Sequence, residues 1–119
     1  MAKTTTTKKD EVLITKSKRR DYLGKDNKGT LIIPNNICDY VGYKNEGIII
    51  VKGNAEDYVG EENKGTIIVK GNARHNVGQK NKGTIIVFGR IITLHDEASG
   101  TIIAGDVKKD YGIPWIKIT

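Results

Sequence analysis

The sequence is poor in several residue types, and each shortage excludes a class of protein. Aromatic residues make up only 6% of the chain, with one Phe and one Trp, which is little for a compact globule. Cys38 is the only cysteine, so neither an intrachain disulfide nor a thiolate metal cluster can form. No apolar run approaches the roughly 20 residues that span a bilayer, and the N-terminal residues lack the apolar stretch of a secretory signal. These absences predict a soluble, cytoplasmic protein of one domain.

Charge is concentrated at the N-terminal end. The net charge is +6, and residues 1–20 hold seven cations and two anions, a net +5. The cations nearest the repetitive part are Lys16, Lys18, Arg19 and Arg20. Such a segment can contact nucleic acid or another polyanion, or it can be a solvated tail that guards an edge. We treat residues 1–10 as a basic, Thr-rich tail.

Glycine is abundant, at 14 residues, and recurs every eighteen positions. One series is Gly24, Gly42, Gly60, Gly78, and a second is Gly29, Gly47, Gly65, Gly83. Apolar columns keep the same step, for example Leu31, Ile49, Ile67 and Ile85. Six units account for residues 11–119, and the fifth is one residue short.

Each unit carries one short β-branched segment, such as Thr66-Ile67-Ile68-Val69-Lys70, and none has the apolar spacing of a long helix. Eighteen residues are too few for a βαβ unit. They suffice to wrap once around a narrow core and return one strand spacing, about 4.8 Å, along the axis. The chain is therefore predicted to be all-β, a parallel β-helix of about six coils. Apolar residues do not recur every six positions, and parallel crossovers are usually right-handed, so we expect a right-handed coil.

Turn and ladder residues follow from this architecture. The two glycine series should allow positive φ at corners, and a third corner is expected at Gly53, Gly71 and Gly89, where Gly71-Asn72 should be left-handed. Stacked amides should hydrogen-bond from coil to coil along the column Asn27, Asn45, Asn63, Asn81. A second Asn column contains Asn36, Asn54 and Asn72. The C-terminal residues 112–119, with Pro114 and Trp115, are expected to cap the last coil.

The repeat also resembles a known family. The resemblance lies in the segment Tyr58-Val59-Gly60, followed by Lys64-Gly65-Thr66-Ile67-Ile68-Val69-Lys70-Gly71-Asn72-Ala73. It is similar to the Gly-rich (GXGXG) repeats of the C-terminal domain of the glutamate synthase large subunit and of the C subunit of formylmethanofuran dehydrogenase. The resemblance covers about residues 11–107. It implies a right-handed β-helix with a structural role, packed against the catalytic parts of an oxidoreductase complex.

Reactive chemistry is mostly missing from the sequence. Lys64 precedes Gly65, whereas a phosphate-binding loop needs Lys after its second Gly and then a helix. His75 and His95 are twenty residues apart, not one coil, and no third ligand recurs, so no metal site is expected. Cys38 shares a column with Glu56 and Arg74 and should point outward, at least partly exposed, without a His to activate it. We predict no catalytic, cofactor or metal residues.

Surface columns are the remaining candidates for function. Tyr22, Tyr40, Tyr58 and Tyr111 form an aromatic column that can be a docking face or can shield the coil corners. Trp115 belongs with this candidate interface. A Thr column, interrupted by Ile48, is explained equally by strand propensity. The leading hypothesis is a non-catalytic scaffold or assembly module whose partners are protein subunits or further copies. The alternative is nucleic-acid binding through the basic N-terminal segment.

Overall fold

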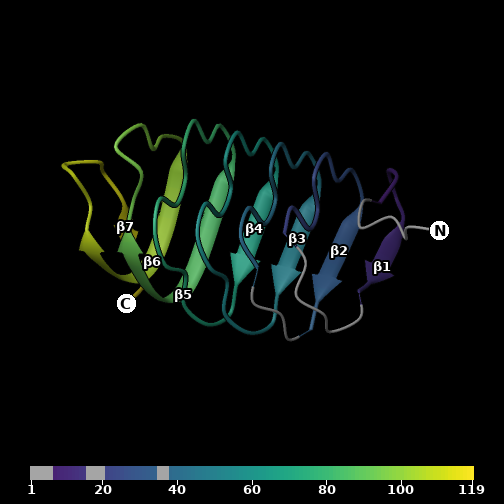
Figure 1. Ribbon diagram of the computed structural model, residues 1–119, viewed down its shortest axis with the longest axis horizontal. Coiled ribbons are helices and arrows are strands. Elements are labelled where there is room, and N and C mark those ends of the chain that lie inside the picture. Colours follow the sequence, from purple (N-terminus) through teal and green to yellow (C-terminus); the bar gives the residue numbers. More distant parts are fainter. Residues whose placement is uncertain (1–6, 16–20, 35–37) are drawn as a thin grey trace.

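The chain folds as a single β-solenoid, seen in a computed structural model that describes residues 7–15, 21–34 and 38–119 (Figure 1). Seven strands form one parallel sheet in chain order, and the described residues contain no helix. The strands are β1 (Val12–Ile14), β2 (Thr30–Ile33), β3 (Ile48–Val51), β4 (Thr66–Val69), β5 (Thr84–Thr93), β6 (Thr101–Lys109) and β7 (Ile116–Lys117). The predicted parallel β-helix is confirmed. Its right-handed sense rests on the crossover preference given above.

The register reproduces the sequence repeat. Thr30 pairs with Ile48, Ile48 with Thr66, and Thr66 with Thr84, each a step of eighteen residues. Thr84 then pairs with Thr101, seventeen residues on. The last step is only thirteen residues, because Ile103 pairs with Ile116. The described chain thus makes about five turns of the repeat, and the prediction of about six coils was too high. The body measures 43 × 24 × 23 Å.

The core is a stack of apolar columns that run along the axis. Leu31, Ile49, Ile67 and Ile85 are fully buried, as the sequence columns predict. Leu23, Val41, Val59 and Val77 form a second buried column, continued by Leu94. Trp115 and Ile113 pack against the C-terminal end of this core, as expected of the cap, whereas Pro114 is exposed.

The asparagine ladder forms as predicted. The side-chain amide of Asn27 donates to Asn45 Oδ1 at 2.9 Å, and Asn63 donates to Asn81 Oδ1 at 2.8 Å. Both ends of the ladder are closed: Thr7 bonds Asn27 at one end, and Ser99 accepts from the Asn81 amide through its carbonyl at the other. Thr7 is buried, so the core fold begins inside the segment that the sequence assigned to a tail, residues 1–10.

The two long glycine series are required for different physical reasons. Gly60 has a φ of +75°, a left-handed conformation, and its column neighbours do likewise. Gly65 does not need positive φ. A Cβ there would lie 2.1 Å from the carbonyl oxygen of Gly47 in the preceding coil. Glycine in this second series therefore lets the coils approach, rather than turning the chain.

The predicted left-handed corner at Gly71-Asn72 is wrong, because neither residue has a positive φ. A Cβ on Gly71 would lie 2.2 Å from Asn54 Oδ1, so glycine serves close approach there too. Asn54 and Asn72 nevertheless form a ladder: Oδ1 of each accepts the backbone N–H one coil on, at Asn72 and Arg90, both at 2.8 Å. Asn36 lies outside the described residues.

Candidate interaction surfaces

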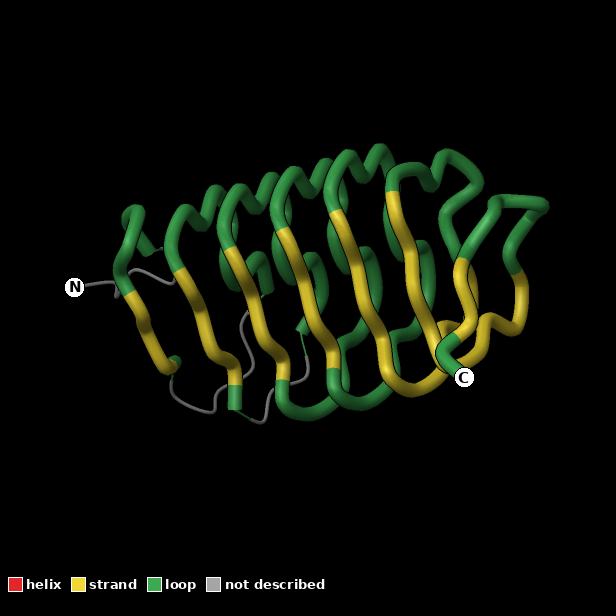
Figure 2. Tube along the Cα trace, turned by 180° about the vertical axis from the view of Figure 1, so that it is seen from behind, coloured by secondary structure: helices red, strands yellow, loops and turns green. Residues whose placement is uncertain are grey.

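The parallel sheet forms one long side of the solenoid (Figure 2), and an apolar side chain recurs on its outer side at every strand. Along each strand, side chains alternate between the core and this outer side. One outward column consists of an isoleucine on every strand, each paired in register with the next: Ile14, Ile32, Ile50, Ile68, Ile86, Ile103 and Ile116. Beside it runs a column of Val12, Thr30, Ile48, Thr66, Thr84 and Thr101. On the other side lie Pro34, Lys52, Lys70 and Phe88, and we call these three columns the outer sheet face.

Several large apolar side chains of the outer sheet face are exposed. Val12 is 65% exposed, Ile14 64%, Ile116 57% and Phe88 50%. The central isoleucines, such as Ile50 and Ile68, are half-buried and lie in register with one another on neighbouring strands. The predicted Thr column lies on this face, interrupted by Ile48 and continued by Val12.

Lysines lie along both edges of the outer sheet face. Lys52 and Lys70 follow β3 and β4 and continue the strand ladder, because their N–H groups donate to Ile33 and Val51 of the preceding coils. The Lys70 ammonium lies 5.6 Å from the Phe88 ring centroid. At the opposite border, the position two residues before each of β1 to β5 holds Asp10, Lys28, Glu46, Lys64 and Lys82, all exposed. The face itself carries no carboxylate among the residues that the structure describes.

The tyrosine column forms a stacked corner. Tyr22 and Tyr40 have ring centroids 4.5 Å apart and nearly parallel planes, and Tyr40 and Tyr58 are 4.7 Å apart. Each of these tyrosines has a positive φ, near 60°, although none is a glycine. Tyr111 makes its ring contact with the Lys109 ammonium, 4.8 Å from the centroid. The structure therefore stacks three of the four predicted tyrosines; Trp115 instead packs at the C-terminal end of the core.

Burial between its two neighbours raises the pKa of the Tyr40 phenol, and the nearby Tyr22 and Tyr58 hydroxyls add to the effect. The inner part of the column is thus partly desolvated. This environment suits a corner shield, and it also suits a contact region, so the interface role of the tyrosines stays a prediction.

An aspartate ladder supports the tyrosine corner, and the sequence analysis did not identify it. Asp21 Oδ1 accepts the N–H of Asp39, Asp39 Oδ1 that of Asp57, and Asp57 Oδ1 that of His75, each at 3.0 Å. The signal was present, because an aspartate precedes each stacked tyrosine at the eighteen-residue step. Asp39, Glu56 and Asp57 bring ligand oxygens within 4.8 Å of one another. Two of these carboxylates already bind backbone N–H groups, and Glu56 pairs with Arg74 at 3.7 Å, which accounts for the cluster structurally.

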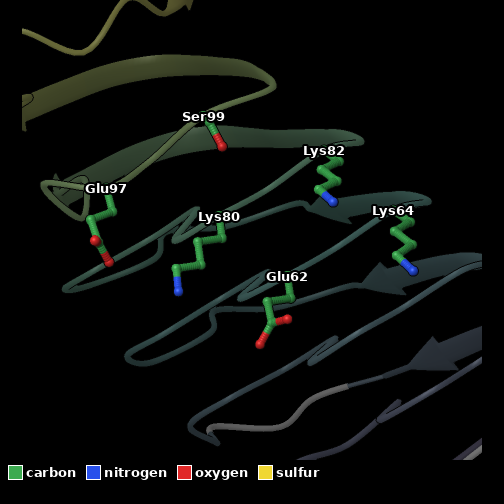
Figure 3. A pocket seen from close by; sticks show the side chains of 6 residues that line it. All are labelled: Glu62, Lys64, Lys80, Lys82, Glu97 and Ser99. Carbon is green, nitrogen blue, oxygen red and sulfur yellow. The ribbon is translucent and has the colours of Figure 1, made fainter.

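A shallow depression of about 290 Å³ adjoins the border of the outer sheet face at Lys64 and Lys82. Its lining residues are Glu62, Lys64, Lys80, Lys82, Glu97 and Ser99 (Figure 3). Lys80 stands between Glu62 and Glu97 in Figure 3. These three continue a column in which charge alternates at every coil from Asp26 and Lys44 onward. Opposite charges in neighbouring coils balance one another, so the depression is a mixed-charge surface rather than an anion site.

The histidines do not form a joint site. His75 contacts Thr93 Oγ1 at 3.5 Å, whereas His95 Nδ1 accepts the N–H of Glu97 at 2.9 Å and lies beside the Tyr58 ring. The expectation that Cys38 is exposed is wrong: the side chain is fully buried. Its backbone keeps the predicted register with Glu56. A small thiol can be covered at a corner where Glu56 and Arg74 extend to solvent.

The basic residues Lys16, Lys18, Arg19 and Arg20 lie outside the described residues, so polyanion binding there stays a prediction. Within the part of the chain that is described, no helix is long and apolar enough to cross a membrane. Comparisons of the chain with protein-family models, with curated proteins and with solved structures gave no match.

Proposed function

We propose that the chain is a non-catalytic β-helix scaffold that joins protein subunits, and that the outer sheet face is its main contact surface. The supporting observation is the uninterrupted column of seven isoleucines on a face that nothing in the described chain covers. Strands of parallel sheets that read as continuous apolar runs are normally buried on both faces. The strand β3, Ile-Ile-Ile-Val, is such a run, and only its inner face is buried within the chain.

The size of the face supports the proposal. Seven strands about 4.8 Å apart span about 29 Å, and five residues of strand span about 13 Å. An apolar patch of several hundred Å² on a small protein is often an interaction site. Burial of apolar surface favours association by about 25 cal/mol per Å² before the entropic cost of binding is subtracted.

The ladders make the fold a suitable scaffold. The central coils are bonded to one another through their strands, their asparagines and their aspartate or asparagine corners. The contact surface is therefore presented on a rigid body that need not reorganise on binding. With the repeat resemblance, this supports a structural subunit of a cytoplasmic multi-subunit oxidoreductase, similar to glutamate synthase or formylmethanofuran dehydrogenase.

Isolation of the chain from its native source, without overexpression, tests the proposal. We expect it to elute from a sizing column in a stoichiometric complex, well above its own mass of 13.1 kDa. Recovery of the chain as a free monomer under gentle extraction would contradict a scaffold role.

A further inference from the structure

The outer sheet face has the dimensions of one α-helix laid along the solenoid axis. A helix is about 10 to 12 Å wide with its side chains and rises 1.5 Å per residue, so about 20 residues span about 30 Å. The three outward columns give about 13 Å by 29 Å. The Ile14 to Ile116 column lies between the other two and runs parallel to the axis.

The charges at the borders determine which helix fits. Lys52 and Lys70 lie on one side, and Lys28, Lys64 and Lys82 on the other, where Asp10 and Glu46 are the two anions among the five positions. A helix seated on the isoleucines places the residues that flank its apolar stripe above these lysines. Carboxylates at those flanks are attracted, whereas ammonium groups are repelled.

We propose that the outer sheet face binds an amphipathic helix of a partner protein, one whose aliphatic stripe is flanked on both sides by Glu or Asp. This inference rests on the proposed scaffold function and names the chemistry of the partner. The isoleucines supply the buried area, and Lys52 and Lys70 on one border with Lys64 and Lys82 on the other select the acidic helix.

A second copy of this chain fits the face less well. When two such faces meet about a two-fold axis along the strands or along the solenoid, lysine borders oppose lysine borders. Like charges brought together at the rim of an apolar contact oppose association. Border charge therefore favours a partner of opposite sign over self-association.

Two synthetic helical peptides of about 20 residues test the proposal with the full chain. Both carry the same aliphatic stripe; one has Glu at the flanking positions and the other has Lys. Fluorescence anisotropy measures the affinity of each at two salt concentrations. We expect the Glu-flanked peptide to bind at least about tenfold more tightly, and to lose affinity as salt rises.

Variants of the chain locate the contact. The double variant Lys52→Glu with Lys70→Glu should weaken the Glu-flanked peptide and strengthen the Lys-flanked one. The matched control is Lys44→Glu with Lys80→Glu, which makes the same charge change in the alternating-charge column outside the face. This variant should still bind the Glu-flanked peptide more tightly than the Lys-flanked one. Ile50→Thr with Ile68→Thr keeps β-branched residues on the strands, so it should fold while weakening both peptides. Thermal unfolding checks that each variant is folded.

Four results would overturn the proposal: equal affinity for both peptides, no binding of the Glu-flanked peptide at about 1 mM, a monomer–dimer equilibrium abolished by the Ile50→Thr, Ile68→Thr variant, or stronger binding to phosphatidylserine vesicles through the same lysines. Failure of the scaffold function can be distinguished from failure of this proposal. If the complex isolated from the native source survives the face variants, this surface is not the joint although the scaffold role stands. If no complex exists, the scaffold role itself is wrong.

Discussion

The side-chain amide of Asn45 donates a hydrogen bond to Oδ1 of Asn63, one coil further along, at 2.9 Å. Asn63 in turn donates to Asn81, and its Oδ1 also accepts the N–H of Gly65 at 3.1 Å. Asn63 is fully buried. One polar side chain thus satisfies groups in three successive coils, beside a core made mostly of aliphatic residues.

Replacement of Asn63 by Ala should remove this rung, so that the Asn45 amide and Asn81 Oδ1 each lose one of their buried hydrogen bonds. Buried polar groups that lose their bonds cost about 1 to 3 kcal/mol each, so we expect the free energy of unfolding to fall by about 2 to 4 kcal/mol. Urea unfolding followed by circular dichroism measures the change. Asn72→Ala removes the hydrogen bond that Asn72 Oδ1 accepts from the Arg90 N–H at an exposed corner. This variant should cost about 1 kcal/mol or less. Equal losses for the two variants would show that the buried ladder is not a major source of stability.

Gly65→Ala should be far more disruptive than Gly112→Ala. The added Cβ at position 65 meets the Gly47 carbonyl oxygen at 2.1 Å, a backbone atom that cannot move without separating two coils. We expect a loss of about 4 kcal/mol or more, near the whole stability of a small domain. Position 112 has open space around it and a φ of +79°, so alanine there should cost about 1 to 2 kcal/mol. Melting temperatures of the two variants compare the costs; similar values would contradict the close-approach role of Gly65.

The eighteen-residue register and the inward columns could be predicted from sequence, because each core position must repeat its residue type when coils stack. The backbone conformation of the corner residues could not be predicted in this way. Tyr58 and Glu62 adopt positive φ without being glycine. Hydrogen bonds between coils hold them there and outweigh the local preference: the Tyr58 N–H donates to the His75 carbonyl, and the Glu62 N–H to the Gln79 carbonyl.

The candidate site was partly within reach of sequence reasoning. The two-residue strand period places Ile68 on the same side as Thr66, so the isoleucine column could have been found with the Thr column. The burial of Cys38 could not have been predicted, because the polar residues in its column, Glu56 and Arg74, indicated an exposed position. The short final coil, with its thirteen-residue step, depends on how Ile113 and Trp115 pack on the end of the core.

Stability should fall at alkaline pH through Tyr40. The folded pKa of its phenol is raised above the ordinary value of 10.0, chiefly by desolvation and then by Tyr22 and Tyr58. A group with a raised folded pKa contributes stability that is present below the unfolded pKa and is lost as pH rises through the folded one. Spectrophotometric titration should show the Tyr40 phenol ionising above its ordinary pKa. Tyr40→Phe keeps the stacked ring and should remove that late step and part of the alkaline loss. An unchanged titration curve in Tyr40→Phe would assign the late step to another residue.

The thiol of Cys38 should react slowly in the native protein. The side chain is fully buried, and a reagent such as Ellman's must wait for local opening of the coil. We expect the rate in denaturant to exceed the native rate by at least about a hundredfold, since local opening usually costs several kcal/mol. Introduction of cysteine at Lys52, an exposed position, gives a fast-reacting control. A native rate equal to that of the control would contradict the burial and restore the exposed position that the sequence suggested.

Trp115 should report the protonation of Asp110. Its indole N–H donates to Asp110 Oδ2 at 3.0 Å, and the Gly112 N–H donates to Oδ1 at 2.9 Å. These two hydrogen bonds hold the pKa of the Asp110 carboxyl below its ordinary value of 3.8, and the bond from Gly112 has the larger effect. A lowered folded pKa stabilises the turn above the unfolded pKa, and this contribution is lost as pH falls through the folded value. Because Trp115 is the only tryptophan, its emission should shift to the red in that acidic range while circular dichroism of the sheet is retained. Asp110→Asn cannot titrate and should abolish the acid step, whereas an acid shift that persists in this variant would assign it to general unfolding of the coil.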